Sequence, residues 1–248
     1  MDFDKIGNEQ IPVFFKTLSK MKAGQAGILP KEQYEIAAVR ANFPPHNYTF
    51  KILTNGDPCA GRSALIKRYV CDTFPEDYVP NKGWVSSSII YYKFLHLNGE
   101  TMCLQIWDVV SDPADFRTSA SSYWRGSSAV VIVFDLTNSE SLQKIKEWMV
   151  QIDRYCTDEP MRVIIGNKSD KKQRIISYEE MRERCFCMGV EYFETSAKTS
   201  YNVEEVFTQI GLQLLESRMA KEAKEAKLAQ QAKEAKEAKQ AKEVNIPK

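Results

Sequence analysis

The chain has 248 residues, of which 43% are hydrophobic and 27% are charged, so a sizeable core can form and global disorder is excluded. The 34 basic and 33 acidic residues nearly cancel, which argues against a nucleic-acid partner held by bulk positive charge. The longest apolar run, residues 129–134, is too short to span a bilayer, and the first residues show no secretory signal. We therefore expect a cytoplasmic protein.

Residues 1–47 predict an N-terminal extension that is partly helical. Apolar side chains recur near helical spacing between Ile11 and Met21, with lysines among them. This segment fits a basic amphipathic helix that touches a membrane or a partner, or more simply a helix packed back on the domain. Pro44 and Pro45 mark its end, because neither can donate a backbone hydrogen bond to a helix or sheet.

Residues 48–217 alternate between strand-like and helix-like segments. Strands are predicted at residues 48–53, 89–97, 101–107, 129–134, 163–165 and 190–193. Helices are predicted near residues 65–69, 142–152 and 203–214, with further helix-start patterns at Ser177-x-x-Glu180 and Asn202-x-x-Glu205. An Asn98-Gly99 pair predicts a hairpin between the second and third strands. The alternation indicates an open, mostly parallel α/β sheet with helices on both faces.

Residues 218–248 form a low-complexity tail rich in lysine, glutamate and alanine. Alanine recurs at every third position from Ala220 to Ala241. The composition favours helix, but a period of three leaves no lasting apolar stripe, so a coiled-coil seam is not predicted. We expect a solvated single helix, with a partner-binding spacer as the functional alternative.

Residues 56–63, Gly-Asp-Pro-Cys-Ala-Gly-Arg-Ser, have the spacing of a phosphate-binding loop, with arginine at the usual lysine position. The loop follows a predicted strand and opens a predicted helix, where backbone amides and the helix N-terminus favour a bound phosphate. The Ser63 hydroxyl would bind magnesium. Taken alone, the segment also fits a simple strand-to-helix turn. The predicted contacts to nucleotide from this loop are Gly56, Cys59, Ala60, Gly61, Arg62, Ser63 and Ala64.

Three more polar motifs follow predicted strands. Asp108 stands where a second magnesium-holding carboxylate belongs. Asp170, in Asn167-Lys-Ser-Asp, can accept from N1–H and the exocyclic amine of guanine, a donor pair that adenine lacks. Backbone amides of Thr195-Ser-Ala-Lys could meet the guanine carbonyl. Because such strand ends share one sheet edge, the motifs predict a single site. Its base-binding residues would be Asn167, Lys168, Asp170, Ser196, Ala197 and Lys198.

With these residues in place, the segment resembles a Ras-superfamily small GTPase, and most of all a Rab. The resemblance covers about 170 residues, 48–217. It rests on Leu104-Gln-Ile-Trp-Asp, Phe116-Arg-Thr, Ser122-Tyr-Trp-Arg-Gly, Phe134-Asp-Leu-Thr, Asn167-Lys-Ser-Asp, Glu194-Thr-Ser-Ala-Lys and Asn202-Val-Glu-Glu-Val-Phe. It implies the small-GTPase form of the P-loop NTPase fold, with a mostly parallel six-stranded sheet. It also implies GTP/GDP and Mg²⁺ as cofactors, GTP hydrolysis, protein effectors or regulators in vesicle trafficking or signalling, and a monomer that binds no nucleic acid.

Departures from the family pattern concern the phosphates. Arg62 replaces the phosphate-binding lysine and is larger and planar, although it keeps the charge. Cys59 stands where Rabs usually have glycine. Counting forward from the loop places Asn81 at the family's magnesium-binding threonine, whereas counting backward from Gly99 gives Val85. An insertion is therefore expected, and rival ligands follow at Ser86, Ser87 and Ser88.

The second switch departs further. Ser111 replaces the glycine that senses the γ-phosphate, and Asp112 replaces the glutamine that orients the attacking water. An anion at this position should repel the γ-phosphate, although Asp112 could alternatively serve as a catalytic base. The last cysteine is Cys187, so no prenyl membrane anchor is expected, and recruitment to membranes would be peripheral and through partners.

The predicted function is therefore guanine-nucleotide binding with slow or absent intrinsic GTP hydrolysis. The alternative is a pseudo-GTPase scaffold that keeps the fold, no longer switches and binds no nucleotide.

Overall fold

A computed structural model describes residues 43–74, 87–110 and 121–244. The segment 11–21, for which an amphipathic helix is predicted, lies outside these ranges, as do Asn81, Val85, Ser86, Ser111 and Asp112. Ser87 and Ser88 lie in a described strand, but only their backbone is described.

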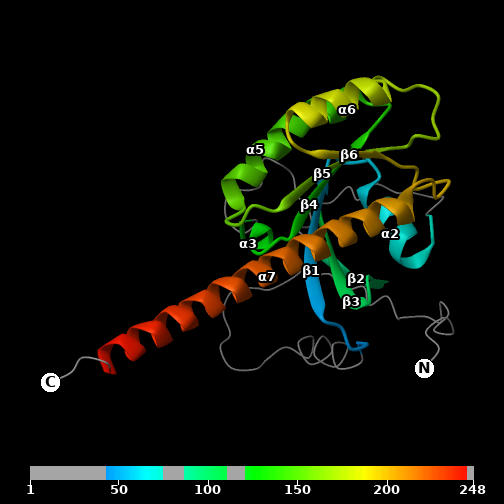
Figure 1. Ribbon diagram of the computed structural model, residues 1–248. Helices are drawn as coiled ribbons and strands as arrows, with labels where there is room; N and C mark the ends of the chain where they lie inside the picture. Colours follow the sequence, from blue (N-terminus) through cyan, green and yellow to red (C-terminus); the bar gives the residue numbers. More distant parts are fainter. Residues whose placement is uncertain (1–42, 75–86, 111–120, 245–248) are drawn as a thin grey trace, which may run out of the picture.

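One six-stranded sheet organises the described part of the chain (Figure 1). Its strands are β1 (Tyr48–Gly56), β2 (Ser87–Leu97), β3 (Glu100–Val110), β4 (Ala129–Asp135), β5 (Met161–Asn167) and β6 (Glu191–Glu194). The spatial order is β2-β3-β1-β4-β5-β6. All neighbours pair in parallel except β2 and β3, which are antiparallel. The predicted mostly parallel six-stranded α/β sheet is therefore confirmed.

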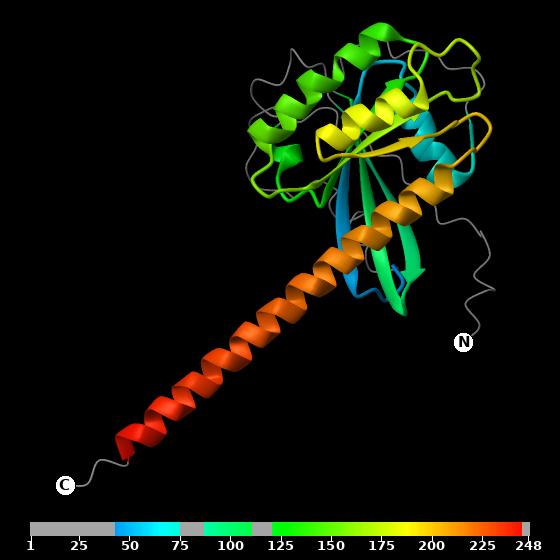
Figure 2. The ribbon, with the colours of Figure 1, turned by 45° about the horizontal axis from the view of Figure 1, so that its top comes forward.

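Helices cover both faces of this sheet (Figures 1 and 2). They are α2 (Arg62–Cys71), α3 (Ser121–Trp124), α4 (Ser139–Gln143), α5 (Ile145–Tyr155), α6 (Tyr178–Cys187) and α7 (Val203–Val244). One apolar cluster joins α2 and the start of α7 to one face, and a second joins α3, α5 and α6 to the other. The central strand β4 is buried along its whole length because it contributes alternately to both clusters.

The hairpin between β2 and β3 forms at the predicted position. Leu97 pairs with Glu100, and the two residues between them, Asn98 and Gly99, have φ angles of 53° and 80°. Left-handed conformations at both central residues are what a tight hairpin turn of this kind requires, and Asn and Gly adopt them at the lowest cost. This turn fixes the register that brings Asp108 opposite Ile89.

The two predicted helix starts differ. The Ser177 hydroxyl accepts a 3.1 Å hydrogen bond from the Glu180 backbone N–H and caps α6, as its pattern predicts. Asn202 has a φ of 57°, and its side-chain amide donates to the Glu194 carbonyl at 2.8 Å. This asparagine therefore ties the start of α7 to the end of β6, where a capping box was expected.

The last helix runs far past the sheet (Figure 2). As far as residue 234, Leu215 is the last buried residue of α7, and residues 216–234 are exposed except for the half-buried Glu222, which accepts a hydrogen bond from the Tyr48 hydroxyl at 3.3 Å. The alanine-rich repeat thus continues α7 as a solvated helix. Among the described helices, none combines the length and apolar character needed to cross a bilayer.

Candidate functional site

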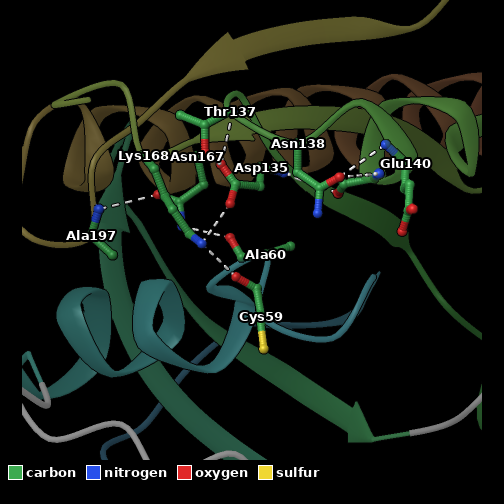
Figure 3. Close-up of polar contacts among 10 residues, drawn as sticks. Cys59, Ala60, Asp135, Thr137, Asn138, Glu140, Asn167, Lys168 and Ala197 are labelled. Carbon is green, nitrogen blue, oxygen red and sulfur yellow. Dashed lines mark hydrogen bonds and ion pairs between the residues drawn. The ribbon is translucent and has the colours of Figure 1, made fainter. Parts of the chain in front are cut away.

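The predicted motifs meet at one edge of the sheet because parallel strands end on the same side. The loop after β1 leads into α2, β5 ends at Asn167, and β6 ends at Glu194. Side chains and backbone atoms from these loops contact one another directly (Figure 3). Residues 56–63 are thus held by contacts from distant parts of the chain, which a simple strand-to-helix turn does not require.

The phosphate-type loop has a backbone path that needs its glycines. Gly61, the residue before α2, has a φ of 89°, and a Cβ there would lie 2.4 Å from Nδ2 of Asn167. Gly56 has a φ of 146°, and a Cβ there would lie 2.0 Å from the Val133 carbonyl oxygen. Cys59 adopts a left-handed φ of 66° although it has a side chain, which costs some strain. The loop path therefore favours glycine at positions 56 and 61 and imposes backbone strain at Cys59.

Asn167 joins the loop to the last motif. Its Nδ2 donates to the Ala60 carbonyl at 3.0 Å, while its Oδ1 accepts from the Ala197 backbone N–H at 3.2 Å. The Thr195 hydroxyl donates to the same oxygen at 3.3 Å. Asn167 is almost completely buried, so these contacts satisfy an amide that would otherwise be costly to bury. One side chain thus holds three segments of the chain in fixed relation.

Lys168 adds a charged link to the same loop (Figure 3). Its Nζ donates to the Cys59 carbonyl at 2.6 Å and to Oδ2 of Asp135, at the end of β4, also at 2.6 Å. Burial by itself raises the pKa of Asp135, but the hydrogen bonds from Lys168 and Thr137 outweigh it and lower that pKa below its ordinary value. Asp135 therefore stays ionised and anchors the lysine.

Asp170, which is predicted to read the base, lies in the loop that follows β5. Its side chain is exposed at the edge of the site, and its Oδ1 accepts from the Ser196 hydroxyl at 2.6 Å. Ser196 is buried, and its oxygen also accepts from the Thr199 backbone N–H at 3.1 Å. These hydrogen bonds fix the orientation of the Asp170 carboxylate.

The segment that carries Ala197 and Lys198 is also tied to α2. Nε of Arg68 donates to the Ala197 carbonyl at 2.9 Å, and its Nη2 donates to the Lys198 carbonyl at 3.4 Å. Sequence reasoning did not identify Arg68, because its partners lie far away along the chain and are backbone atoms. The guanidinium fixes the loop that would meet the base.

Arg62 departs from the predicted arrangement. Its Nε donates to Oδ1 of Asp108 at 2.7 Å, and its Nη1 donates to the Gly56 carbonyl at 3.2 Å. The two charged side chains are 11% and 3% exposed, so the ion pair is nearly dry. Magnesium prefers anionic and neutral oxygen ligands in octahedral geometry. A carboxylate already in contact with a guanidinium does not fit that role, and the donor set around Asp108 as it stands does not match a magnesium site.

The remaining predicted residues divide into two groups. Ser63 and Ala64 lie in the first turn of α2, beside Arg62 and partly buried. The switch residues Asn81, Ser111 and Asp112 lie outside the described residues, so their assigned roles stay predictions.

Two acidic residues of the site were not assigned a role from the sequence. Asp135 belongs to the Phe134-Asp-Leu-Thr segment and ends the apolar run of β4. A carboxylate at the end of a buried strand was the sequence feature that could have identified it as a site residue. Asp57 is buried in the phosphate-type loop and pairs with Lys144 at 3.2 Å. Burial raises the pKa of Asp57, and Lys144 offsets only part of that effect.

Comparison with known proteins identifies the family. The model of the Ras family matches residues 51–216. The GTP-binding protein ypt1 of Schizosaccharomyces pombe is 37% identical over 174 residues, which are 70% of this chain and 83% of that protein. The Ras-related protein RABD2a of Arabidopsis thaliana is 38% identical over 180 residues, which are 72% of this chain and 86% of that protein. The chain therefore belongs to the Ras family and is a Rab-like small GTPase in sequence and fold.

Proposed function

We propose that this chain binds GDP and GTP at the sheet edge where β1, β5 and β6 end, and that it hydrolyses GTP slowly or not at all without a partner. The observation that carries the proposal is the buried Asn167 amide. It bonds the phosphate-type loop through Ala60 and the last motif through Ala197. These contacts set a loop suited to phosphates beside two segments suited to a base.

Base choice follows from Asp170. Its exposed carboxylate can accept from N1–H and the exocyclic amine of guanine, while Ser196 holds it in place from the protein side. Adenine offers no matching pair of donors at those positions. The name of ypt1 describes a GTP-binding protein, which agrees with this assignment.

Phosphate binding follows from the loop and the helix after it. Residues 57–61 bend with left-handed φ angles at Cys59 and Gly61, and α2 begins at Arg62. The unpaired amides of a helix N-terminus and its positive end stabilise an anion. The Lys168 ammonium adds a positive charge next to the same loop, because its Nζ donates a hydrogen bond to the Cys59 carbonyl.

Impaired hydrolysis rests on the sequence of the second switch. Asp112 stands at the position of the water-orienting glutamine and carries a charge that opposes the γ-phosphate. At the preceding position, Ser111 has less backbone conformational freedom than the glycine that the family has there. The cellular role proposed by similarity to Rab relatives is vesicle trafficking or signalling through protein effectors.

The test is to identify nucleotide retained by the purified protein. Native chain and an Asp170→Asn variant are denatured, and the released nucleotide is separated by chromatography. Asp153→Asn serves as the matched control. Asp153 is an exposed carboxylate of α5 that pairs with Arg162 of β5, and it is not one of the predicted site residues. We expect guanine nucleotide from the native chain and the control, and much less from Asp170→Asn. Adenine nucleotide in equal amount would contradict the proposal.

A second candidate, a pseudo-GTPase scaffold, is favoured by one observation. The Arg62 guanidinium, which stands at the position of the family's phosphate-binding lysine, donates its hydrogen bonds to Asp108 and to the Gly56 carbonyl. Its charge is thus already paired within the protein, as a scaffold that binds no phosphate would allow. If neither retained nor added guanine nucleotide binds the native chain, while its fold and melting transition are intact, the scaffold replaces the nucleotide-binding proposal.

A further inference from the structure

The ion pair between Arg62 and Asp108 stands at the junction of the phosphate-type loop and β3. Asp108 lies in register with Thr54 of β1, so the sheet places this carboxylate directly beside the strand that leads into the loop. Arg62 begins α2 and reaches back to Asp108 with Nε and to Gly56 with Nη1. The guanidinium is thus held at two points, by a side chain and by the backbone of the loop.

This arrangement depends on arginine. A lysine ammonium is a single point charge on a flexible stem, whereas the guanidinium is planar, permanently charged and able to donate in several directions at once. Its contacts to Asp108 and Gly56 use only part of its N–H groups. A guanidinium with N–H groups left over can in general donate to a phosphate oxygen while it keeps such an ion pair.

The same contacts oppose a divalent cation. Asp108 is almost fully buried, and its charge is balanced by a guanidinium at 2.7 Å. A dication drawn to Asp108 would have to displace that guanidinium, which would leave a buried cation uncompensated, or sit beside it and be repelled. Of the sequence-predicted metal ligands whose side chains the structure describes, Ser63 would then remain, and its hydroxyl would have to hold magnesium beside the phosphates without the carboxylate that usually helps.

We propose that the Arg62–Asp108 ion pair takes the place of magnesium, so that this chain binds guanine nucleotide without a divalent cation. The inference rests on the proposed nucleotide binding and departs from the assignment of Ser63 and Asp108 as magnesium ligands. In this arrangement Arg62 supplies the positive charge that faces the diphosphate, and Asp108 positions Arg62.

The test measures GDP affinity by titration calorimetry in two buffers, one with excess magnesium and one with a chelator. The native chain is compared with Arg62→Lys, which returns a point cation that can leave Asp108. Arg184→Lys is the matched control, because Arg184 also pairs with a carboxylate, Glu180, but on the exposed face of α6. Circular dichroism melting confirms that each variant folds.

For the native chain and Arg184→Lys we expect the dissociation constant for GDP to change less than about threefold between the buffers, a small free-energy difference. For Arg62→Lys we expect magnesium to tighten binding by at least about tenfold, the scale of one charge-assisted contact. A native chain that gains tenfold or more from magnesium overturns the inference and leaves the proposed function standing. An Arg62→Lys chain as insensitive to magnesium as the native one also overturns it, since arginine would then not be the cause.

The two proposals fail differently. If the native chain binds GDP in neither buffer, the proposed function falls and the inference falls with it. If Arg62→Lys does not fold, the native titrations in the two buffers still decide whether magnesium is needed.

Discussion

Lys168 and Asp135 show how a single ion pair connects the interior of the sheet to the candidate site. The lysine is one-quarter exposed and the carboxylate is mostly buried, so solvent screens this pair less than the surface pairs on α6 and α7. Through the Cys59 carbonyl, the same ammonium holds the phosphate-type loop. Lys168 therefore links the interior of the sheet to the conformation of this loop.

We expect Asp135→Asn to lower the free energy of unfolding at neutral pH by about 1–3 kcal/mol, because Lys168 loses its charged partner. The folded pKa of Asp135 lies below its ordinary value, so its contribution is present above that value and is lost as pH falls through the folded pKa. The gap between native and variant should therefore be constant near neutrality and narrow below about pH 4.

Urea unfolding of both chains between neutral and acidic pH measures this gap. The exposed-pair variant Asp153→Asn is the control and should differ little from the native chain at any pH. If the difference in the free energy of unfolding widens on acidification, the contact with Lys168 does not stabilise the ionised form of Asp135.

At the scale of elements, the turn from β1 into α2 depends on Gly61. The residue combines a left-handed φ with a close approach to the Asn167 amide. Gly99 offers a matched comparison, since its φ is also left-handed at 80° but nothing lies within 4 Å of the Cβ position. An alanine at either position would strain the backbone, but only an alanine at position 61 would also clash with a neighbouring side chain.

We expect Gly61→Ala to destabilise the fold by about 2 kcal/mol more than Gly99→Ala, because only the first variant must displace a buried amide. It should also weaken guanine-nucleotide binding at least about tenfold, since Asn167 positions Ala60 and Ala197. Thermal melts and GDP titrations of both variants check this. Equal effects of the two substitutions would mean that the contact with Asn167 does not matter.

The end of α7 is a second element whose role can be isolated. Residues 216–234 of the helix are exposed except for the half-buried Glu222, which accepts the hydrogen bond from the Tyr48 hydroxyl. Deleting residues 220–248 should leave GDP affinity unchanged within about twofold and shift the melting temperature by less than about 3 °C. Loss of nucleotide binding on truncation would show that the tail contributes to the site.

At the scale of the whole molecule, most of the sheet was predictable because its signals are local. The continuous apolar runs of β4 and β5 indicate strands covered on both faces, and Asn98-Gly99 indicates the hairpin. One helix was predicted over residues 142–152, but the structure divides this region into α4 and α5 at Lys144. The division was not predictable, because the sequence around Lys144 contains no glycine or proline.

The contacts of the site were less predictable because they join residues far apart in the chain. Asn167, Lys168 and Asp170 were identified from their motif, whereas the bond between Lys168 and Asp135 depends on β4 and β5 lying side by side. Arg62 was expected to face phosphate. Its pairing with Asp108 follows from the register of β1 against β3, which no local pattern specifies.

The proposed impairment of hydrolysis belongs to the whole molecule, since it rests on the sequences of the second switch and of the phosphate-type loop together. Single-turnover GTP hydrolysis by the native chain should be no faster than on the order of 10⁻⁴ per second, the rate of an unassisted small GTPase. Asp112→Gln should raise it less than about tenfold, because Ser111 and Arg62 remain. Turnover within seconds without a partner would sink the assignment of impaired catalysis.

The central claim is that this site binds guanine nucleotide through Asp170, and base selectivity tests it most directly. Binding of GDP, ADP and xanthosine diphosphate is measured for the native chain and Asp170→Asn. Xanthine carries a carbonyl where guanine has its exocyclic amine, so an asparagine amide can donate where a carboxylate cannot.

The native chain should prefer GDP over ADP by at least about 100-fold, and Asp170→Asn should lose about 100-fold in GDP affinity and prefer xanthosine diphosphate. Equal native binding of ADP and GDP, or GDP binding that Asp170→Asn leaves unchanged, would contradict the account.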